Sequence, residues 1–223
     1  MPTQPLRVVV LISGHGSNLQ VFIDHQSTGR LPIDIRSVIS SRADAYGLVR
    51  AKHAGIEHET LLPRDFASRE RYDLALRDRI NRYRADLVIL AGFMRILTPV
   101  FLAPYEGRVI NIHPSLLPAL RGMHTHERAL REGLREHGCS VHYVTSALDA
   151  GPVIVQARVP VQPEDCVESL QRRVQQQEYR IYPLAVRWIA EGQIEMRDHT
   201  VWRQGRRQDR PVVVTADDDL ECL

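Results

Sequence analysis

The sequence predicts an α/β protein with an open, mostly parallel twisted sheet that carries helices on both faces. Nearly continuous apolar runs at residues 7–12 and 86–92 are typical of strands that are covered on both sides. Between such runs lie longer segments in which apolar side chains recur at helical spacing. Strands that alternate with helices form parallel sheets through right-handed crossovers, and this alternation predicts the fold class.

A glycine loop at residues 13–18 follows the first strand directly and precedes an amphipathic helix at residues 19–25. Strand, glycine loop and helix in this order point backbone N–H groups at an anion. Ser17 or Asn18 is expected to cap the helix. The loop lacks the third glycine of a dinucleotide motif and the lysine of a Walker motif, so it favours a single phosphate. A plain strand-to-helix turn is the alternative.

The alternation continues along most of the chain. Further strands are expected at residues 33–40, 56–62, 86–92, 109–113, 139–145 and 153–161. Helices are expected at residues 45–54, 69–84, 124–135 and 167–190, with a short one opening at Pro99. Ser68 is a suitable N-cap for the second of these helices, and Pro183 should kink or divide the last. Residues 194–202 are expected to form a β-hairpin.

Length and composition favour one globular domain at residues 1–204, followed by a charged, flexible tail at residues 205–223. The net charge is only +2, from 29 basic and 27 acidic residues, which argues against a nucleic-acid partner. The chain shows neither an apolar run of membrane-spanning length nor a signal peptide. The cysteines, Cys139, Cys166 and Cys222, lack metal-binding spacing and fit a reducing cytoplasm.

Two polar side chains stand out at the end of the strand at residues 109–113. Asn111 and His113 alternate with apolar residues, so both side chains point to one face of the strand, and Pro114 ends it. Alone, this pattern also fits a strand end whose polar groups bond the next loop. The glycine loop and residues 94–97 also follow strands, however, and ligands bind where the carboxyl ends of parallel strands meet. This convergence favours a functional site.

A histidine beside an asparagine, with no suitably spaced nucleophile, suggests acid–base chemistry and stabilisation of a developing oxyanion. Asp149 is a candidate partner, because a carboxylate stabilises a nearby imidazolium; a turn residue is the alternative. His124 and His126 superficially resemble a metal pair, but positions two apart on a helix point in different directions. No metal is therefore expected. Met94, Ile96 and Leu97 could line a pocket for a flat ring or belong to the core.

Five motifs lie at residues 9–20, 91–97, 111–118, 122–126 and 148–152, and they include Asn-Ile-His-Pro-Ser-Leu-Leu-Pro. Together they resemble the phosphoribosylglycinamide formyltransferases, folate-dependent enzymes of purine synthesis. The likeness runs from about Val8 to Trp202 in constant order and implies a Rossmann-like formyltransferase fold. The sequence departs from the usual pattern at His15, where asparagine is common, at Ala150, where glycine is frequent, and at residues 119–121.

The resemblance implies transfer of a formyl group from 10-formyltetrahydrofolate, a cosubstrate, to the amine of glycinamide ribonucleotide, by a cytoplasmic monomer or homodimer without a metal. The positions that match the family's catalytic residues are Asn111, His113 and Asp149. Those that match its ribonucleotide site are Gly16, Ser17, Asn18 and Glu178. Those that match its folate site are Arg69, Met94, Arg95, Ile96, Leu97 and Asn111.

Three other functions compete with this interpretation. A formyltetrahydrofolate hydrolase has the same Asn-His-Asp arrangement but uses water as the acceptor; the glycine loop favours a phosphorylated acceptor. A methionyl-tRNA formyltransferase would need a basic RNA-binding domain. A non-catalytic or dehydrogenase-like nucleotide binder would have to rely on the incomplete glycine motif and would leave Asn111, His113 and Asp149 unexplained.

Overall fold

The computed structural model describes residues 4–220, so that Cys222 and the last three residues of the expected tail lie outside the described residues. The chain divides into two compact units, which meet in sequence between Asn111 and Ile112. Each unit is described by itself. That residues 1–204 form one cooperative domain stays a prediction, which a single thermal unfolding transition would support.

The first unit alternates strands and helices from its first strand to its last. Its strands are β1 (Leu6–Ile12), β2 (Ile33–Ser40), β3 (His58–Thr60), β4 (Leu87–Leu90) and β5 (Val109–His113), whose last two residues belong to the second unit. Its helices are α1 (Ser17–Ser27), α2 (Tyr46–His53), α3 (Arg69–Arg82) and the short α4 (Pro99–Leu102), with 3₁₀ turns at Pro63–Asp65 and Ala103–Tyr105.

The strands of this unit are all parallel and follow the order β5-β4-β1-β2-β3. β1 is central: Val10 pairs with Val38 of β2 on one side and with Ile89 of β4 on the other. The side chains from Val8 to Ile12 are completely buried, as a strand covered on both faces requires.

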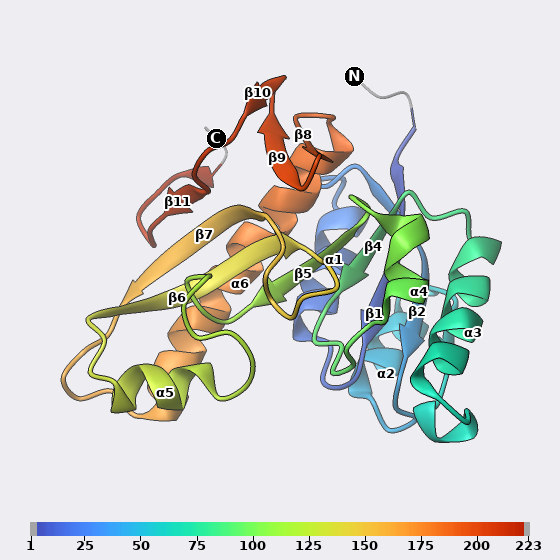
Figure 1. The fold of residues 1–223 in the computed structure, drawn as a ribbon, viewed down its shortest axis with the longest axis horizontal. Coiled ribbons are helices and arrows are strands. Elements are labelled where there is room, and N and C mark those ends of the chain that lie inside the picture. The colour runs from blue at the N-terminus through green and yellow to red at the C-terminus, as the bar shows by residue number, and fades with distance from the viewer. Residues whose placement is uncertain (1–3, 221–223) are drawn as a thin grey trace. The chain divides into compact units, whose positions relative to one another are not determined.

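The order also explains where the helices lie (Figure 1). The chain moves outward from β1 to β3 and then returns to β4, on the other side of β1. Right-handed crossovers in opposite directions place α1 and α2 on one face and α3 on the other. The contact between α1 and α2 agrees with this arrangement. The predicted open parallel sheet with helices on both faces is therefore confirmed.

The second unit contains α5 (Thr125–Arg131), β6 (Glu136–Tyr143), β7 (Val153–Pro160), α6 (Val167–Ala190), β8 (Ile194–Arg197), β9 (Thr200–Arg203), β10 (Arg206–Arg207) and β11 (Val212–Val214). β6 and β7 are antiparallel, β11 is parallel to β7, and β5 adjoins β6 in the strand order. The long helix α6 packs along β6 and β7 (Figure 1). The small sheet β10-β9-β8 contains the predicted hairpin.

Several local predictions hold and a few are wrong. The bounds of β2, β5 and α6 are those expected, and the Ser68 hydroxyl caps α3 by accepting from the Arg71 N–H at 3.2 Å. The helix expected at residues 124–135 is only Thr125–Arg131, because Gly133 takes a positive φ of 62° and ends it. β6 consequently begins at Glu136, whereas the strand was expected to begin at Cys139. Pro183 does not divide α6, which continues to Ala190.

The segment after residue 204, which we expected to be a charged, flexible tail, contains β10 and β11. β11 adds to the sheet beside β7, and its Val214 is 1% exposed. The guanidinium of Arg180 on α6 also donates to the carbonyl oxygen of Thr215 at 2.9 Å. The flexibility of this tail stays a prediction, to be tested by amide exchange of β11.

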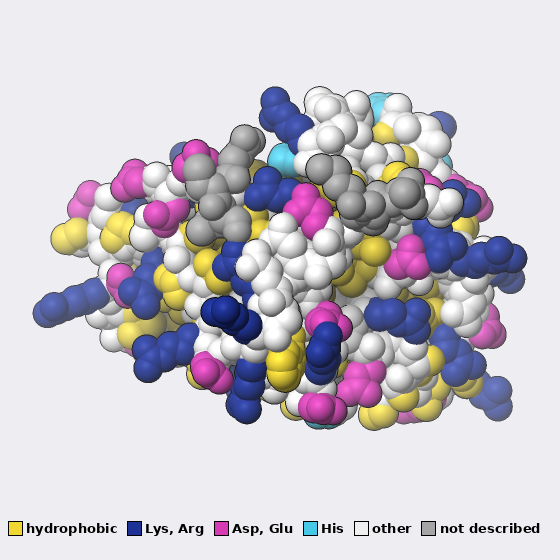
Figure 2. Space-filling view, turned by 90° about the horizontal axis from the view of Figure 1, so that it is seen from above, with side chains coloured by type: hydrophobic (Ala, Val, Ile, Leu, Met, Phe, Trp, Pro, Cys, Tyr) yellow, Lys and Arg dark blue, Asp and Glu magenta, His cyan; other side chains and the backbone are white. Residues whose placement is uncertain are grey.

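The surface reflects the nearly even balance of charge in the sequence. On the face drawn in Figure 2, Lys and Arg side chains are interspersed with Asp and Glu side chains. Among the residues that the structure describes, no helix is long and apolar enough to cross a membrane.

Candidate active site

The glycine loop joins β1 to α1 in the first unit. Gly16 is the N-cap of α1 and has a φ of 72°, in the left-handed region that a residue with a side chain rarely adopts. A Cβ atom at Gly16 would also lie 2.6 Å from the Cα of Gly47. The prediction that Ser17 or Asn18 is the cap is wrong, since both lie within the first turn of the helix. The first N–H groups of any helix lack an acceptor in the preceding turn, so the start of α1 suits an anion.

The segment after β4 forms a second ligand-shaped loop in the first unit. The N–H of Met94 donates to the Ser13 hydroxyl at 2.8 Å, and Arg69 Nη2 donates to the carbonyl oxygen of Ile96 at 2.8 Å. Met94 and Ile96 are 64% and 53% exposed, whereas Leu97 is 5% exposed and belongs to the core. The structure thus brings Arg69 to the expected folate loop and leaves two large apolar side chains on its surface.

His113 is the last residue of β5 and belongs to the second unit. Its side chain is almost completely buried, and its Nδ1 lies 3.4 Å from Oδ2 of Asp149. Its Nε2 lies 3.0 Å from the carbonyl oxygen of Leu120, which can only accept a hydrogen bond. Both ring nitrogens therefore face oxygen acceptors, an arrangement that suits an imidazolium. Asn111 lies two positions earlier on the same strand and is half-buried.

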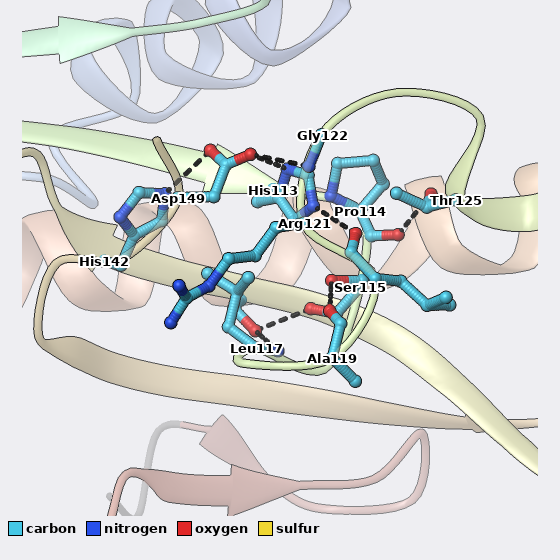
Figure 3. Close-up of polar contacts among 12 residues, drawn as sticks. His113, Pro114, Ser115, Leu117, Ala119, Arg121, Gly122, Thr125, His142 and Asp149 are labelled. Atoms are coloured by element: carbon cyan, nitrogen blue, oxygen red, sulfur yellow. Dashed lines mark hydrogen bonds and ion pairs between the residues drawn. The ribbon is translucent and has the colours of Figure 1, made fainter. Parts of the chain in front are cut away.

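Asp149 occupies the turn between β6 and β7, with a positive φ of 47°. Figure 3 shows its carboxylate between His113 and His142. Oδ2 also accepts from the N–H of Gly122 at 3.0 Å, and Oδ1 lies 3.8 Å from Nε2 of His142. The contacts of this carboxylate with Gly122 and His113 join groups far apart in sequence, which favours the alternative in which Asp149 is a partner of the imidazole.

His142 is a member of the cluster that the sequence analysis did not single out. Its ring is 2% exposed, and burial lowers its pKa to about 4, although Asp149 and the Tyr143 carbonyl favour the charged form. Its Nδ1 lies 2.9 Å from that carbonyl oxygen and so carries the proton. At neutral pH His142 is uncharged, so it contributes no positive charge beside Asp149. Its position at the end of a strand, just before the Asp149 turn, was the available signal.

The loop that follows His113 is held by its own side chains. The Thr125 hydroxyl donates to the carbonyl oxygen of Pro114 at 2.7 Å, and the Ser115 hydroxyl donates to that of Ala119 at 2.7 Å (Figure 3). Ser115 is therefore occupied within the loop, which does not suit a nucleophile. The loop in turn presents the Leu120 carbonyl to His113.

Two further histidines of this unit, His126 and His137, form a separate pair. Nε2 of His137 lies 3.1 Å from Nδ1 of His126, and the rings meet edge to face. Burial lowers the pKa of both, that of His137 to about 4. His124, the N-cap of α5, is exposed near Glu127. Within residues 4–220, no three His, Cys, Asp or Glu side chains form a group that could hold a metal ion.

Glu178 lies on α6 in the second unit and is half-buried. The preceding residue, Gln177, is 7% exposed, and its side-chain oxygen accepts from Arg180 Nη1 at 2.6 Å.

Within each unit the structure brings some of the expected site residues together. Arg69 contacts the folate loop in the first unit, and His113 contacts Asp149 in the second. Arg95 is exposed in the loop after β4.

Comparisons with known proteins agree with this geometry. The model of a family described as formyl transferase matches residues 6–186. The phosphoribosylglycinamide formyltransferase of Escherichia coli is 52% identical over 202 residues, which cover 91% of this chain and 95% of the relative. A solved structure of the phosphoribosylglycinamide formyltransferase from Coxiella burnetii is 47% identical and has a TM-score of 0.91, with 95% of this chain and all of that chain covered.

A more distant solved structure bears on the rival function. A formyltetrahydrofolate deformylase from Pseudomonas syringae is 28% identical with a TM-score of 0.83. The match covers 90% of this chain but only 66% of the deformylase. The fold is therefore common to both activities, and the higher identity lies with the transferases.

Proposed function

This chain belongs to the formyl transferase family, and we propose that Asn111, His113 and Asp149 are the residues with which it formylates phosphoribosylglycinamide. The chain is an enzyme, a phosphoribosylglycinamide formyltransferase of purine biosynthesis, as its relatives are. The observation that carries the assignment of the site is the buried contact of 3.4 Å between His113 and Asp149 at the end of β5.

The donor we propose is 10-formyltetrahydrofolate, used as a cosubstrate. In this reaction the amine of the ribonucleotide attacks the formyl carbon, and negative charge develops on the formyl oxygen. Donors that are already aimed at that oxygen stabilise the transition state most. We assign this role to the Asn111 amide and to Nε2 of His113, which exchanges the Leu120 carbonyl for the formyl oxygen.

Asp149 has two roles in this proposal. Its charge stabilises the imidazolium form of His113, and it helps to move a proton from the attacking amine to the departing nitrogen, directly or through water. The Gly122 N–H, which donates to Oδ2, holds the carboxylate in place. The buried ring of neutral His142 lies on the side of the opposite oxygen, with Nε2 3.8 Å from it.

The two substrates are assigned to different loops. We propose that the amides of Gly16, Ser17 and Asn18 bind the ribonucleotide phosphate and that Glu178 contacts the same substrate. Arg69, Met94, Arg95 and the Ile96 backbone are assigned to the folate, whereas Leu97 supports the loop from the core. A cytoplasmic location and a monomeric or homodimeric state remain expectations.

A paired assay tests this function. Purified protein should form the N-formyl product only when glycinamide ribonucleotide and 10-formyltetrahydrofolate are both present. Folate consumption should stop when the amine is omitted. Consumption at an equal rate without the amine would instead identify a hydrolase.

A further inference from the structure

We propose that Arg50, at the C-terminal end of α2, is a positioning residue of the phosphate loop. The inference rests on the proposed function, because it assigns a second helix to the ribonucleotide site. Gly47 and Arg50 hold two carbonyl groups of the glycine loop, those of Gly14 and His15, on the side of α2. The N–H group that follows each carbonyl then faces the phosphate.

Two consecutive carbonyls of the glycine loop are bound by α2. The N–H of Gly47 donates to the carbonyl oxygen of Gly14 at 3.1 Å, and Arg50 Nε donates to that of His15 at 3.0 Å. In a planar trans peptide, a C=O group and the N–H group that follows it point in opposite directions. Holding these carbonyls toward α2 therefore directs the N–H groups of His15 and Gly16 away from it.

α2 can approach the glycine loop closely only because the residues in contact, Gly47 and Gly16, carry no side chains. A Cβ atom at Gly47 would lie 2.5 Å from Cδ1 of Ile12 and 3.3 Å from the Cα of Gly16. The corresponding atom at Gly16 would lie 2.6 Å from the Cα of Gly47. This close approach of backbones brings the Arg50 side chain within reach of the loop.

Further contacts fix the guanidinium itself. Arg50 Nη1 donates to the side-chain oxygen of Gln20 on α1 at 2.9 Å, and Nη2 lies 3.3 Å from Nδ1 of His15. Its central carbon lies 4.9 Å from the centre of the Tyr46 ring, on which the His15 imidazole also stacks at 5.3 Å. These contacts use the planar fork of donors that arginine has and lysine lacks. They aim the charge at protein atoms, so Arg50 acts through the loop.

The test combines kinetics with a binding measurement that needs no turnover. Arg50→Met should raise the KM for glycinamide ribonucleotide about tenfold, the usual effect of losing a charged hydrogen-bond donor. It should leave the KM for the folate unchanged and kcat within about twofold. The dissociation constant for ribose 5-phosphate, measured by calorimetry, should rise by the same factor. Arg50→Lys should recover only part of the loss.

A control variant separates positioning by Arg50 from a general loss of positive charge. Lys52→Met removes an exposed cation from the same helix. It should change the KM and the dissociation constant less than about twofold. Equal losses in Lys52→Met and Arg50→Met, unchanged values in Arg50→Met, or a parallel rise in the folate KM would each overturn the proposal. The binding measurement distinguishes these outcomes even if the protein formylates a different phosphorylated amine.

Discussion

The carboxylate of Asp149 lies 3.4 Å from the imidazole of His113, although the two residues belong to segments separated by the loop after β5, by α5 and by β6. Both side chains are less than one-tenth exposed. Because burial keeps the neighbouring His142 neutral, with a pKa of about 4, the charge of Asp149 is directed to His113. Selective stabilisation of one imidazolium is what the proposed reaction requires.

The first prediction tests this pair. Asp149→Asn preserves the side-chain shape and an oxygen that can accept from Gly122, but removes the negative charge. We expect kcat to fall by about 10²- to 10⁴-fold, the range for a lost acid–base group, because the cation on His113 loses its partner. Steady-state kinetics at saturating substrates check the rate, and an unchanged melting temperature serves as the control. Near-normal turnover would remove Asp149 from the proposed mechanism.

The second prediction concerns the folate loop. Arg69→Met removes the donor to the Ile96 carbonyl, so the loop loses its tether to the start of α3. The KM for 10-formyltetrahydrofolate should rise about three- to tenfold, the effect of one such bond, while the KM for the ribonucleotide stays the same. Arg82→Met, at the exposed far end of α3, is the matched control and should change neither constant. An effect on the ribonucleotide alone would refute the assignment.

The third prediction concerns stability against pH. Burial lowers the pKa of His137 from 6.5 to about 4, so between these values the unfolded chain binds a proton that the folded chain does not. The stability that the neutral His137 ring contributes should therefore be complete above pH 6.5, decrease as the pH falls to about 4, and change no further below pH 4. The contribution is at most about 3 kcal/mol. Urea unfolding of the wild type and His137→Gln should show a weaker pH dependence in the variant. Identical dependences would contradict the prediction.

The fourth prediction concerns the turn that carries Asp149. A Cβ atom at Gly151 would lie 1.8 Å from the carbonyl oxygen of Tyr143, so Gly151→Ala must displace backbone. We expect the free energy of unfolding to fall by about 3 kcal/mol or more. Gly133→Ala is the control, since its Cβ would meet open space and only its φ of 62° is unfavourable, at about 1–2 kcal/mol. If both variants lost the same free energy of unfolding, the contact with the Tyr143 carbonyl oxygen would not be the cause of the loss, and the prediction would be wrong.

The sequence by itself determined the parts of this protein that depend on local periodicity. The bounds of β2, β5 and α6 and the placement of Asn111 and His113 on one face follow from apolar spacing within one segment, and the open parallel sheet follows from the alternation of such segments. The order of the motifs also determined the family. These features need no knowledge of which segments meet.

Tertiary structure alone decided the partners. The contact of Asp149 with His113, the Leu120 carbonyl on His113 and the bond from Arg50 to the glycine loop each join groups whose spacing in sequence carries no signal. The addition of β11 to β7 is a further case, because three valines fit an edge strand or an exposed loop equally well. Such pairings depend on strand register and on the burial that folding creates, and burial is also what makes His142 neutral.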